Sequence, residues 1–147
     1  MICPFCKPEI LSSVFAESEY FYAIYNIAPV FPGHSLLVSK EHFERFTDIP
    51  GQELSELMPF AKKTMEQLTK VFNATDFDIA VQDGFWAGQT IRHFHLHLIP
   101  RYENDLPNPG DWYPLFEKND QKIIDSQSRS MHSVEDISRI VDKLKKS

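Results

Sequence analysis

The chain of 147 residues lacks several features that mark other classes of protein. No apolar stretch approaches the ~20 residues needed to cross a bilayer, and no N-terminal run resembles a signal peptide. Basic residues number 15 against 21 acidic ones, and the net charge of −6 argues against a long nucleic-acid partner, which needs a basic footprint. Repeats and low-complexity tracts are missing as well. The composition, 42% hydrophobic, predicts one domain over residues 1–147 with an ample core and no membrane partner.

Cysteine is scarce: only Cys3 and Cys6 occur, in the sequence Cys-Pro-Phe-Cys. The spacing is that of a zinc knuckle, but two thiolates cannot complete a tetrahedral site, so two further ligands are needed. An unmetallated pair of thiols is one alternative. A redox or disulfide pair is another, although the thioredoxin-like motif requires a βαβ context. Thiols spaced for a metal favour a reducing, cytoplasmic setting.

Histidine, in contrast, is concentrated in one place: His93, His95 and His97 make up half of the six in the chain. Successive side chains of a β-strand point to opposite faces, so the three histidines share one face and the apolar residues between them share the other. Neighbours on one face lie roughly 7 Å apart, so two adjacent histidines could bend onto one metal ion, but hardly all three. A plain alternating strand is the alternative. The pattern predicts one face for chemistry and one for a core.

A loop with two glycines, residues 82–90, precedes this strand and follows an apolar run at 77–81. Gly84 and Gly88 would let backbone amides turn toward a ligand. Neutral donors and acceptors are supplied by Gln82, Gln89 and Thr90. Glycines at this spacing are often only a turn, but beside three aligned histidines they indicate an anion cradle.

The alternating histidines, with Gly-Gln-Thr just upstream, resemble the signature of the histidine triad superfamily of nucleotide hydrolases and transferases. The resemblance extends from about Tyr20 to Arg101 and includes the segments 26–34 and 38–42. The loop is most similar to that of the fragile-histidine-triad branch, which cleaves dinucleoside polyphosphates. Beyond Arg101 little resemblance is visible.

The resemblance implies a mechanism. His95 is the expected nucleophile, which forms a nucleotidyl-histidine intermediate at the α-phosphate, and water then releases a nucleoside monophosphate. His97 would contact the phosphate and help the leaving group, and His34 would be a supporting donor. The implied nucleotide-binding residues are Asn26, Gln82, Gly88, Gln89, Thr90, Ile91 and His97. The expected substrates are dinucleoside polyphosphates such as diadenosine tri- or tetraphosphate, cleaved without an organic cofactor.

Three other functions stay open at this point. Hydrolysis of adenosine phosphoramidates or adenylylated amines is the nearest rival. A nucleotide-binding sensor with incidental turnover is the second. A transferase that passes the nucleotidyl group to an acceptor other than water is the third, although no separate acceptor site can be identified.

Several branches of the superfamily carry an N-terminal Cys-x-x-Cys that binds zinc together with two histidines. One follows the Pro-Gly-His segment and the other is the first of the triad. The matching positions are Cys3, Cys6, His42 and His93. A structural zinc is therefore expected, although the fragile-histidine-triad branch generally lacks these cysteines. The resemblance also implies a homodimer.

The pattern predicts an α+β fold in which a HIT-like antiparallel sheet carries a long helix on one face. Strands are predicted over 19–27, 35–39, 77–82 and 92–99, and a helix over 52–73. Pro59 predicts a kink or break in that helix, and Met58 and Met65 are assigned to core packing. The expected division is a metal-binding segment at 1–18, a core at 19–101, and a loop with a C-terminal helix at 102–147.

The region after Arg101 contains a loop over 104–111, followed by Trp112 and Tyr113. These aromatics are predicted to pack, with stacking on a nucleobase as the alternative. Residues 118–131 are polar and expected to be mobile. Ser133 predicts an N-cap for a terminal helix. The apolar stripe of that helix is Val134, Ile137, Val141 and Leu144. Arg92 and Arg101 flank the triad strand, either as a favourable field for phosphate or as solvated strand ends.

Overall fold

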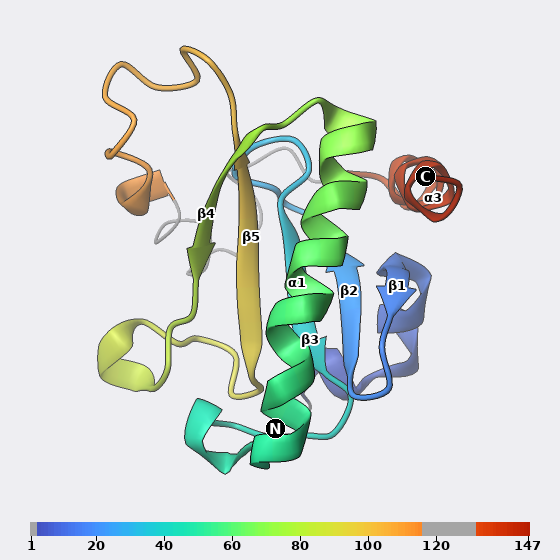
Figure 1. Ribbon diagram of the computed structural model, residues 1–147, viewed down its shortest axis with the longest axis vertical. Helices are drawn as coiled ribbons and strands as arrows, with labels where there is room; N and C mark the ends of the chain where they lie inside the picture. The colour runs from blue at the N-terminus through green and yellow to red at the C-terminus, as the bar shows by residue number, and fades with distance from the viewer. Residues whose placement is uncertain (1–2, 116–131) are drawn as a thin grey trace.

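The computed structural model describes residues 3–115 and 132–147. Five strands form one antiparallel sheet in the order β1-β2-β3-β5-β4. The strands are β1 (Val14–Glu17), β2 (Phe21–Tyr25), β3 (Ser35–Ser39), β4 (Asp76–Ala80) and β5 (His95–Arg101). The long helix α1 (Gly51–Phe72) crosses the sheet, and α3 (Val134–Lys145) lies beside β1 and β2 (Figure 1). The predicted α+β fold is confirmed. Within the described ranges, no helix is long and apolar enough to cross a membrane.

Two features of the sheet differ from the prediction. Strand β1 was not predicted, because its residues were assigned to the metal-binding segment. Strand β5 begins at His95 and not at Arg92, since its pairing with β3 begins at Val38 opposite His95. Just before it, the Phe94 N–H donates to the Phe43 carbonyl over 2.6 Å. His93 therefore precedes the strand, and only His95 and His97 share its face.

Helix α1 is one continuous helix through Pro59, so the expected break is absent. Pro59 and Ser55, whose carbonyl it cannot bond, are both exposed, so water can satisfy that carbonyl. The helix ends at Asn73, which adopts the left-handed conformation at φ 58°. Met65 packs against the core as predicted, but Met58 is 56% exposed and its assignment to the core was wrong.

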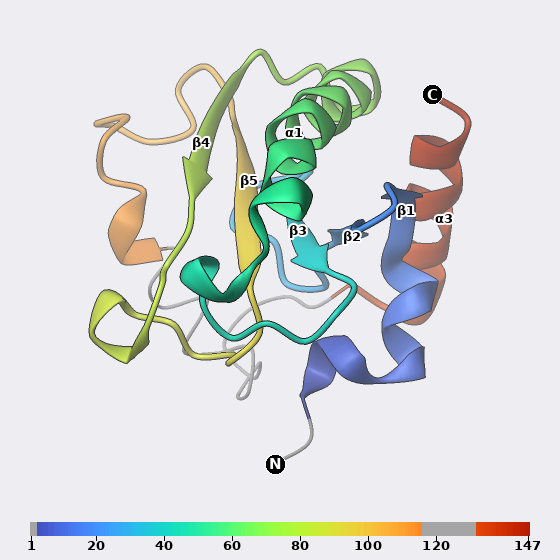
Figure 2. The same cartoon turned by 60° about the horizontal axis from the view of Figure 1, so that its bottom comes forward.

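The main core lies between the sheet and the two helices. Its fully buried members include Phe21, Leu37, Leu68, Leu98 and Leu144. The other face of the sheet carries a smaller apolar cluster. Its members are Ile24, Leu36 and Val38, with Phe5, Ile10, Val14 and Tyr22 packed against them. The N-terminal turns that supply Phe5 and Ile10 thus lie on the sheet face away from α1 (Figure 2).

Most of the prediction for the C-terminal helix α3 is confirmed. Ser133 Oγ accepts from the Asp136 N–H over 3.1 Å, and the Asp136 carboxylate accepts from the Ser133 N–H, which completes a capping box. Ile137 and Val141 are buried, as is Leu144, but Val134 is 80% exposed, so its place in the stripe was wrong. The expectation for 118–131 falls outside the described residues.

Candidate active site and metal centre

A backbone carbonyl orients the ring of His95. His95 is the first residue of β5 and is 5% exposed. Its Nδ1 lies 2.8 Å from the carbonyl oxygen of His93, which can only accept, so Nδ1 carries the proton. In a neutral ring this leaves the lone pair of Nε2 unprotonated. The ring is therefore held in the tautomer that can act as a nucleophile through Nε2.

A relay of hydrogen bonds gives His97 the opposite tautomer. The Val30 N–H donates to Nδ1 of His34 over 3.1 Å, so the proton of a neutral His34 is on Nε2. That Nε2 lies 2.9 Å from Nδ1 of His97 and donates to it. The proton of His97 is then on its own Nε2. The rings of His95 and His97 are 5.0 Å apart at 68°. An unprotonated nitrogen and an N–H donor are thus provided by neighbouring rings.

Burial keeps both of these rings neutral. Desolvation lowers the pKa of His95 to about 4, although its hydrogen bond to the His93 carbonyl works in the other direction. Burial also lowers the pKa of His97 well below its ordinary value, and the adjacent His95 and His34 lower it further. Neutral imidazoles are the form that a nucleophile and an uncharged donor require.

Asn26 and Gln82, two of the residues expected to bind nucleotide, are both buried, at 5% and 8% exposed. Nδ2 of Asn26 lies 3.5 Å from Nδ1 of His34. The register of β4 and β5 pairs Ala80 with His97, and Gln82 follows the end of β4 two residues later.

The loop that follows β4 depends on its glycines. Gly84 and Gly88 have φ angles of +104° and +96°, a region that favours glycine. A Cβ at Gly88 would lie only 2.4 Å from Nε2 of Gln82. A larger residue at position 88 would therefore displace the side-chain amide of Gln82.

The side chain of Gln89 braces the same loop. Its Oε1 accepts from the Gly84 N–H over 2.7 Å, and its Nε2 donates to the carbonyls of Glu44 and Ile91 over 2.9 and 3.1 Å. Gln89 and Ile91 are buried, whereas Thr90 between them is exposed. The side-chain amide of Gln89 is thus hydrogen-bonded within the protein, and these bonds fix the backbone conformation of the loop.

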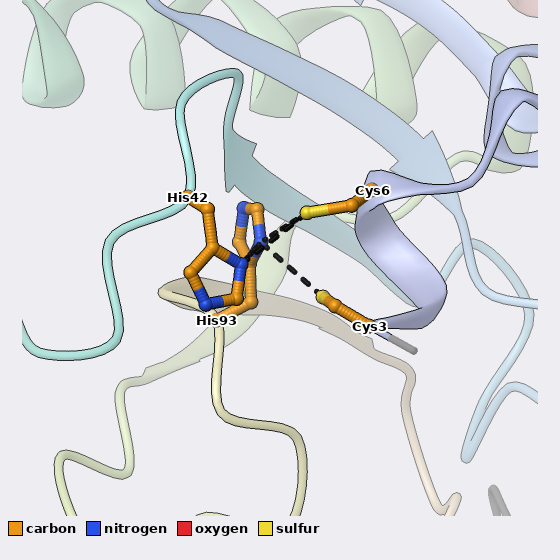
Figure 3. A group of neighbouring side chains, drawn as sticks. All are labelled: Cys3, Cys6, His42 and His93. Atoms are coloured by element: carbon orange, nitrogen blue, oxygen red, sulfur yellow. Dashed lines mark hydrogen bonds between the residues drawn. The ribbon is translucent and has the colours of Figure 1, made fainter. Parts of the chain in front are cut away.

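The four residues expected to bind a metal are brought together. The ligand atoms of Cys3, Cys6, His42 and His93 all lie within 4.8 Å of one another (Figure 3). Nδ1 of His93 is 3.4 Å from Cys3 Sγ, 3.6 Å from Cys6 Sγ and 3.1 Å from Nδ1 of His42, and Cys6 Sγ is 3.3 Å from the His42 nitrogen. Ligands about 2.0–2.3 Å from a tetrahedral ion lie roughly 3.3–3.8 Å apart. The group can therefore hold a metal ion.

Ser39, at the end of β3, sets the tautomer of buried His93 in this cluster. The His93 Nε2 lies 2.7 Å from the Ser39 carbonyl and 3.2 Å from its hydroxyl. Nε2 donates to the carbonyl, which leaves the Nδ1 lone pair toward the two thiols. Burial lowers the pKa of His93, with this hydrogen bond opposing the change, and a metal needs the neutral ring. Sequence reasoning missed this role of Ser39, because nothing in the residue pattern marks it.

The two flanking arginines behave differently from each other. Arg92 is 71% exposed, with its Nε 3.8 Å from Glu44, and is a solvated residue. The side chain of Arg101 is only 10% exposed. It donates to both carboxylate oxygens of Asp105, over 2.7 and 2.8 Å, and to Asp78 over 2.8 Å. Arg101 is thus a buried structural ion pair, and neither of the two expectations describes it.

Of the two aromatics after the loop, Tyr113 lies nearer to the site. Its hydroxyl lies 3.5 Å from Nε2 of Gln82, and its side chain is 44% exposed. Trp112 is half-buried and lines a groove that also involves Arg101. The structure thus associates Tyr113 with a predicted nucleotide-binding residue.

Relatives of known activity resemble the chain. It is 35% identical over 119 residues to the bis(5'-nucleosyl)-tetraphosphatase [asymmetrical] of Schizosaccharomyces pombe, covering 81% of this chain and 65% of that protein. It is 35% identical over 101 residues to the adenosine 5'-monophosphoramidase of Saccharomyces cerevisiae, covering 69% of this chain and 61% of that protein. The chain thus spans slightly less than two thirds of each relative.

Solved structures share the fold of this chain. The Plasmodium falciparum diadenosine triphosphate hydrolase in complex with cyclomarin A superposes with a TM-score of 0.72 at 28% identity, covering 92% of this chain and 75% of that one. A Zn-bound histidine triad family protein from Mycobacterium smegmatis superposes with a TM-score of 0.62 at 26% identity, covering 85% and 97%.

The family model described as the HIT domain matches residues 7–104, which include the sheet, α1 and the histidines at 93, 95 and 97. Only the first turn and the region after Asn104 lie outside the match. Because that match covers more than half of the chain and the geometry supports the same chemistry, this chain belongs to the HIT domain family.

Proposed function

We propose that this protein is a nucleotide hydrolase that cleaves at the α-phosphate through a nucleotidyl-histidine intermediate on His95. The observation that carries the proposal is the 2.8 Å hydrogen bond from Nδ1 of His95 to the His93 carbonyl. It leaves Nε2, the distal nitrogen of the ring, as the only atom of His95 that can attack phosphorus. The same tautomer places no proton in the way of the attack.

The reaction proceeds in two displacements. In the first, Nε2 of His95 forms a bond to the α-phosphorus while the bond from phosphorus to the leaving oxygen breaks. In the second, a water oxygen bonds to phosphorus, the N–P bond breaks, and the water proton passes to solvent. The nucleoside monophosphate leaves and His95 returns to its neutral state.

The surrounding residues stabilise the charge that develops on the phosphate. His97 donates from Nε2 to a phosphoryl oxygen, and His34 holds it in that tautomer through the 2.9 Å hydrogen bond. Nucleotide contacts are assigned to Asn26 and Gln82 beside the histidines, and to the loop backbone. The loop residues concerned are Gly88, Gln89, Thr90 and Ile91.

The preferred substrates are dinucleoside polyphosphates, as the name of the S. pombe relative indicates for that protein. Phosphoramidates are the second candidate, as the name of the S. cerevisiae relative indicates. The two differ in the leaving group: a phosphate can depart as an anion, whereas an amine must gain a proton. Because His97 is also expected to help the leaving group depart, loss of its N–H should reduce phosphoramidate turnover more than dinucleotide turnover.

The test compares wild type, His95→Ala and His132→Ala with diadenosine triphosphate, diadenosine tetraphosphate and an adenosine phosphoramidate, with products read by mass spectrometry. His132 is a matched control, because its ring packs on Tyr25 outside the histidine site. AMP release from the dinucleotides by wild type and His132→Ala, but not by His95→Ala, is the expected result. AMP from the phosphoramidate alone would select the rival. Tight binding without turnover would indicate a sensor, and near-normal turnover by His95→Ala would refute the nucleophile.

We also propose that the metal is a structural zinc held by Cys3, Cys6, His42 and His93. Two thiolates and two neutral imidazoles are a preferred ligand set for zinc, and four protein ligands leave no open position for chemistry. Such thiolates require a reducing compartment, which favours the cytoplasm. Elemental analysis should give one zinc per chain for the wild type and much less for Cys6→Ser. The exposed Ser12→Ala variant serves as the control, and a wild-type protein prepared under reduction without zinc would contradict the assignment.

A homodimer through the edge strand β4 is a further part of the proposal. Strand β4 pairs only with β5 within the described residues, so its other edge is open to a second copy. Apolar side chains are exposed along it and on the facing part of α1, at Ile79 (51%) and Met58 (56%). Analytical ultracentrifugation should give a dimer for wild type and a monomer for Ile79→Lys. A wild-type monomer would exclude the assembly.

Residues 1–147 are proposed to act as one domain. The segment predicted at 1–18 contributes β1 to the sheet, and the segment at 102–147 contributes α3, which packs on the same core. Limited proteolysis that released a stable core lacking either segment would argue against this unit.

A further inference from the structure

The ring of Phe5 lies between the metal centre and the nucleophile. Phe5 belongs to the turn Pro4–Cys6, in which the Cys6 N–H donates to the Cys3 carbonyl over 3.1 Å. Both neighbouring cysteines approach Nδ1 of His93, and this fixes the ends of the turn on the sheet. A residue placed between two metal ligands has little freedom to move while the metal is bound.

Phe5 contacts one histidine of each site, His93 of the metal centre and His95 of the active site. Its ring centroid is 5.6 Å from that of His93 at an angle of 85°, and 5.3 Å from that of His95 at 66°. Both are edge-to-face arrangements, the geometry that aromatic rings prefer. On the sheet, Phe5 packs against the apolar cluster that contains Leu36 and Val38, which pair with His97 and His95. Phe5 therefore packs on the same face of the sheet as His95 and His97.

We propose that Phe5 is a positioning residue for His95, through which the metal-binding turn holds the nucleophilic ring in its reactive orientation. The proposal rests on the function proposed above. Two torsions orient a histidine ring, and the hydrogen bond to the His93 carbonyl restrains only the direction of Nδ1. The Phe5 contact supplies a second restraint from another part of the chain. The ring of His97, 5.0 Å away, supplies a third.

Two of these three restraints on His95 start from the metal centre. The carbonyl that accepts from its Nδ1 belongs to the ligand His93, and the ring that packs against it lies between the ligands Cys3 and Cys6. A structural metal can thereby affect the reaction without touching the substrate. Misplacement of a reacting group by about 1 Å can reduce a rate by about 100-fold.

The test uses the metal-loaded full chain and compares Phe5→Ala, Phe5→Leu and Ile10→Ala. Ile10 is the matched control, because it comes from the same N-terminal segment and packs on the same apolar cluster. Each variant is checked for metal stoichiometry. The kcat and KM for the substrate turned over by wild type are then measured, together with the rate of the first displacement in single-turnover experiments.

Phe5→Ala should keep its metal and lose about 10- to 100-fold in kcat and in the first displacement, with KM changed less than about threefold. Phe5→Leu, which keeps an apolar wall, should recover to within about threefold of wild type. Ile10→Ala should match wild type in kcat. An unchanged kcat in metal-loaded Phe5→Ala, or an equal loss in Ile10→Ala, would overturn the proposal.

A second measurement does not depend on turnover. Nitrogen-15 NMR of the imidazole of His95 reports which ring nitrogen carries the proton. Wild type should show the Nδ1–H tautomer alone, and Phe5→Ala should show a mixture or broadened signals. If the alanine variant does not fold, Phe5→Val should show a smaller change of the same kind. A single unaltered tautomer in the folded variant would refute the positioning role. Because this measurement needs no turnover, its result is distinct from a failure of the proposed hydrolase activity.

Discussion

Strand β5 has two faces that are equally buried and serve opposite purposes. Leu96 and Leu98 on the helix face are 2% and 0% exposed, and His95 and His97 on the other face are 5% and 0% exposed. On the helix face, removal from water stabilises the fold directly. On the histidine face, the same removal disfavours protonation and keeps two imidazoles neutral. Burial alone therefore does not distinguish a core residue from a reactive one; hydrogen-bond partners do.

The burial of the histidines is tolerated because at least one nitrogen of each ring is engaged in a hydrogen bond. His93 donates to the Ser39 carbonyl, His95 donates to the His93 carbonyl, and His34 accepts from the Val30 N–H. A buried polar group without a partner costs roughly 1–3 kcal/mol, and a chain of such groups would oppose folding. Backbone groups thus engage one nitrogen each of His93, His95 and His34, and at the same time choose the tautomers of these rings.

The comparison is tested most severely on the helix face. Leu98→Ala should lower the free energy of unfolding by roughly 3–5 kcal/mol, because it leaves a cavity in a fully buried site. The folded fraction should keep its kcat within about threefold. Urea denaturation with activity assays measures both quantities. Leu11→Ala, at a 54% exposed position, should change the unfolding free energy by less than about 0.5 kcal/mol. A comparable loss in both variants would contradict the assignment of Leu98 to the core.

On the histidine face the opposite result is expected. His97→Gln replaces the imidazole N–H that the His34 relay orients with an amide N–H at a displaced position, and kcat should fall by about 100- to 1000-fold, or roughly 3 kcal/mol in the barrier. The unfolding free energy should change by no more than about 1 kcal/mol, since the amide can still accept from His34. Steady-state kinetics beside urea denaturation provide the check. A large loss of stability with retained kcat would show that His97 contributes to the core and not to the reaction.

The far end of β5 adds a charged group to the comparison. Asp105→Asn should cost roughly 1.5–3 kcal/mol of stability at pH 7, because Arg101 loses a paired carboxylate at a site where both side chains are about nine-tenths buried. The hydrogen bond from Arg101 lowers the pKa of Asp105. Its contribution is therefore complete above the ordinary aspartate pKa and is lost as the pH falls through the lowered value. The variant and wild type should converge in urea denaturation at acid pH, whereas exposed Asp142→Asn should match wild type throughout.

The smallest effect on the free energy of unfolding is expected at a side chain that is almost fully exposed. Trp86 is 96% exposed at the tip of the loop between β4 and β5, and its ring contacts Phe85 edge-on. Trp86→Ala should change the unfolding free energy by less than about 0.5 kcal/mol, despite the size of the side chain. Thermal or urea denaturation of this variant measures the change. A loss above 1 kcal/mol would mean that the ring is covered in solution.

The errors of sequence reasoning have a common physical origin. The spacing of α1 predicted the helix but not which side of it meets the sheet, so Met58 was placed in the core while it is exposed. A kink or break was expected at Pro59, yet the helix continues through this residue because the lost hydrogen bond lies on the solvent side. Val134 began a correct stripe but lies beyond the reach of the core. Each outcome depends on a neighbour far away in the chain.

The residue order alone determined four of the five strands, both helices and the alternation of β5 from His95 onward, because these follow from short-range periodicity and from local caps such as Ser133. The tertiary structure decided everything that joins distant segments. His34 meets His97 across 63 positions, and Phe5 and the cysteines meet His93 and His95 from the other end of the chain. It also moved His93 off the strand, toward the thiols. Tautomer and reactivity depend on atoms within about 3 Å of a ring, and no pattern of spacing specifies which atoms those are.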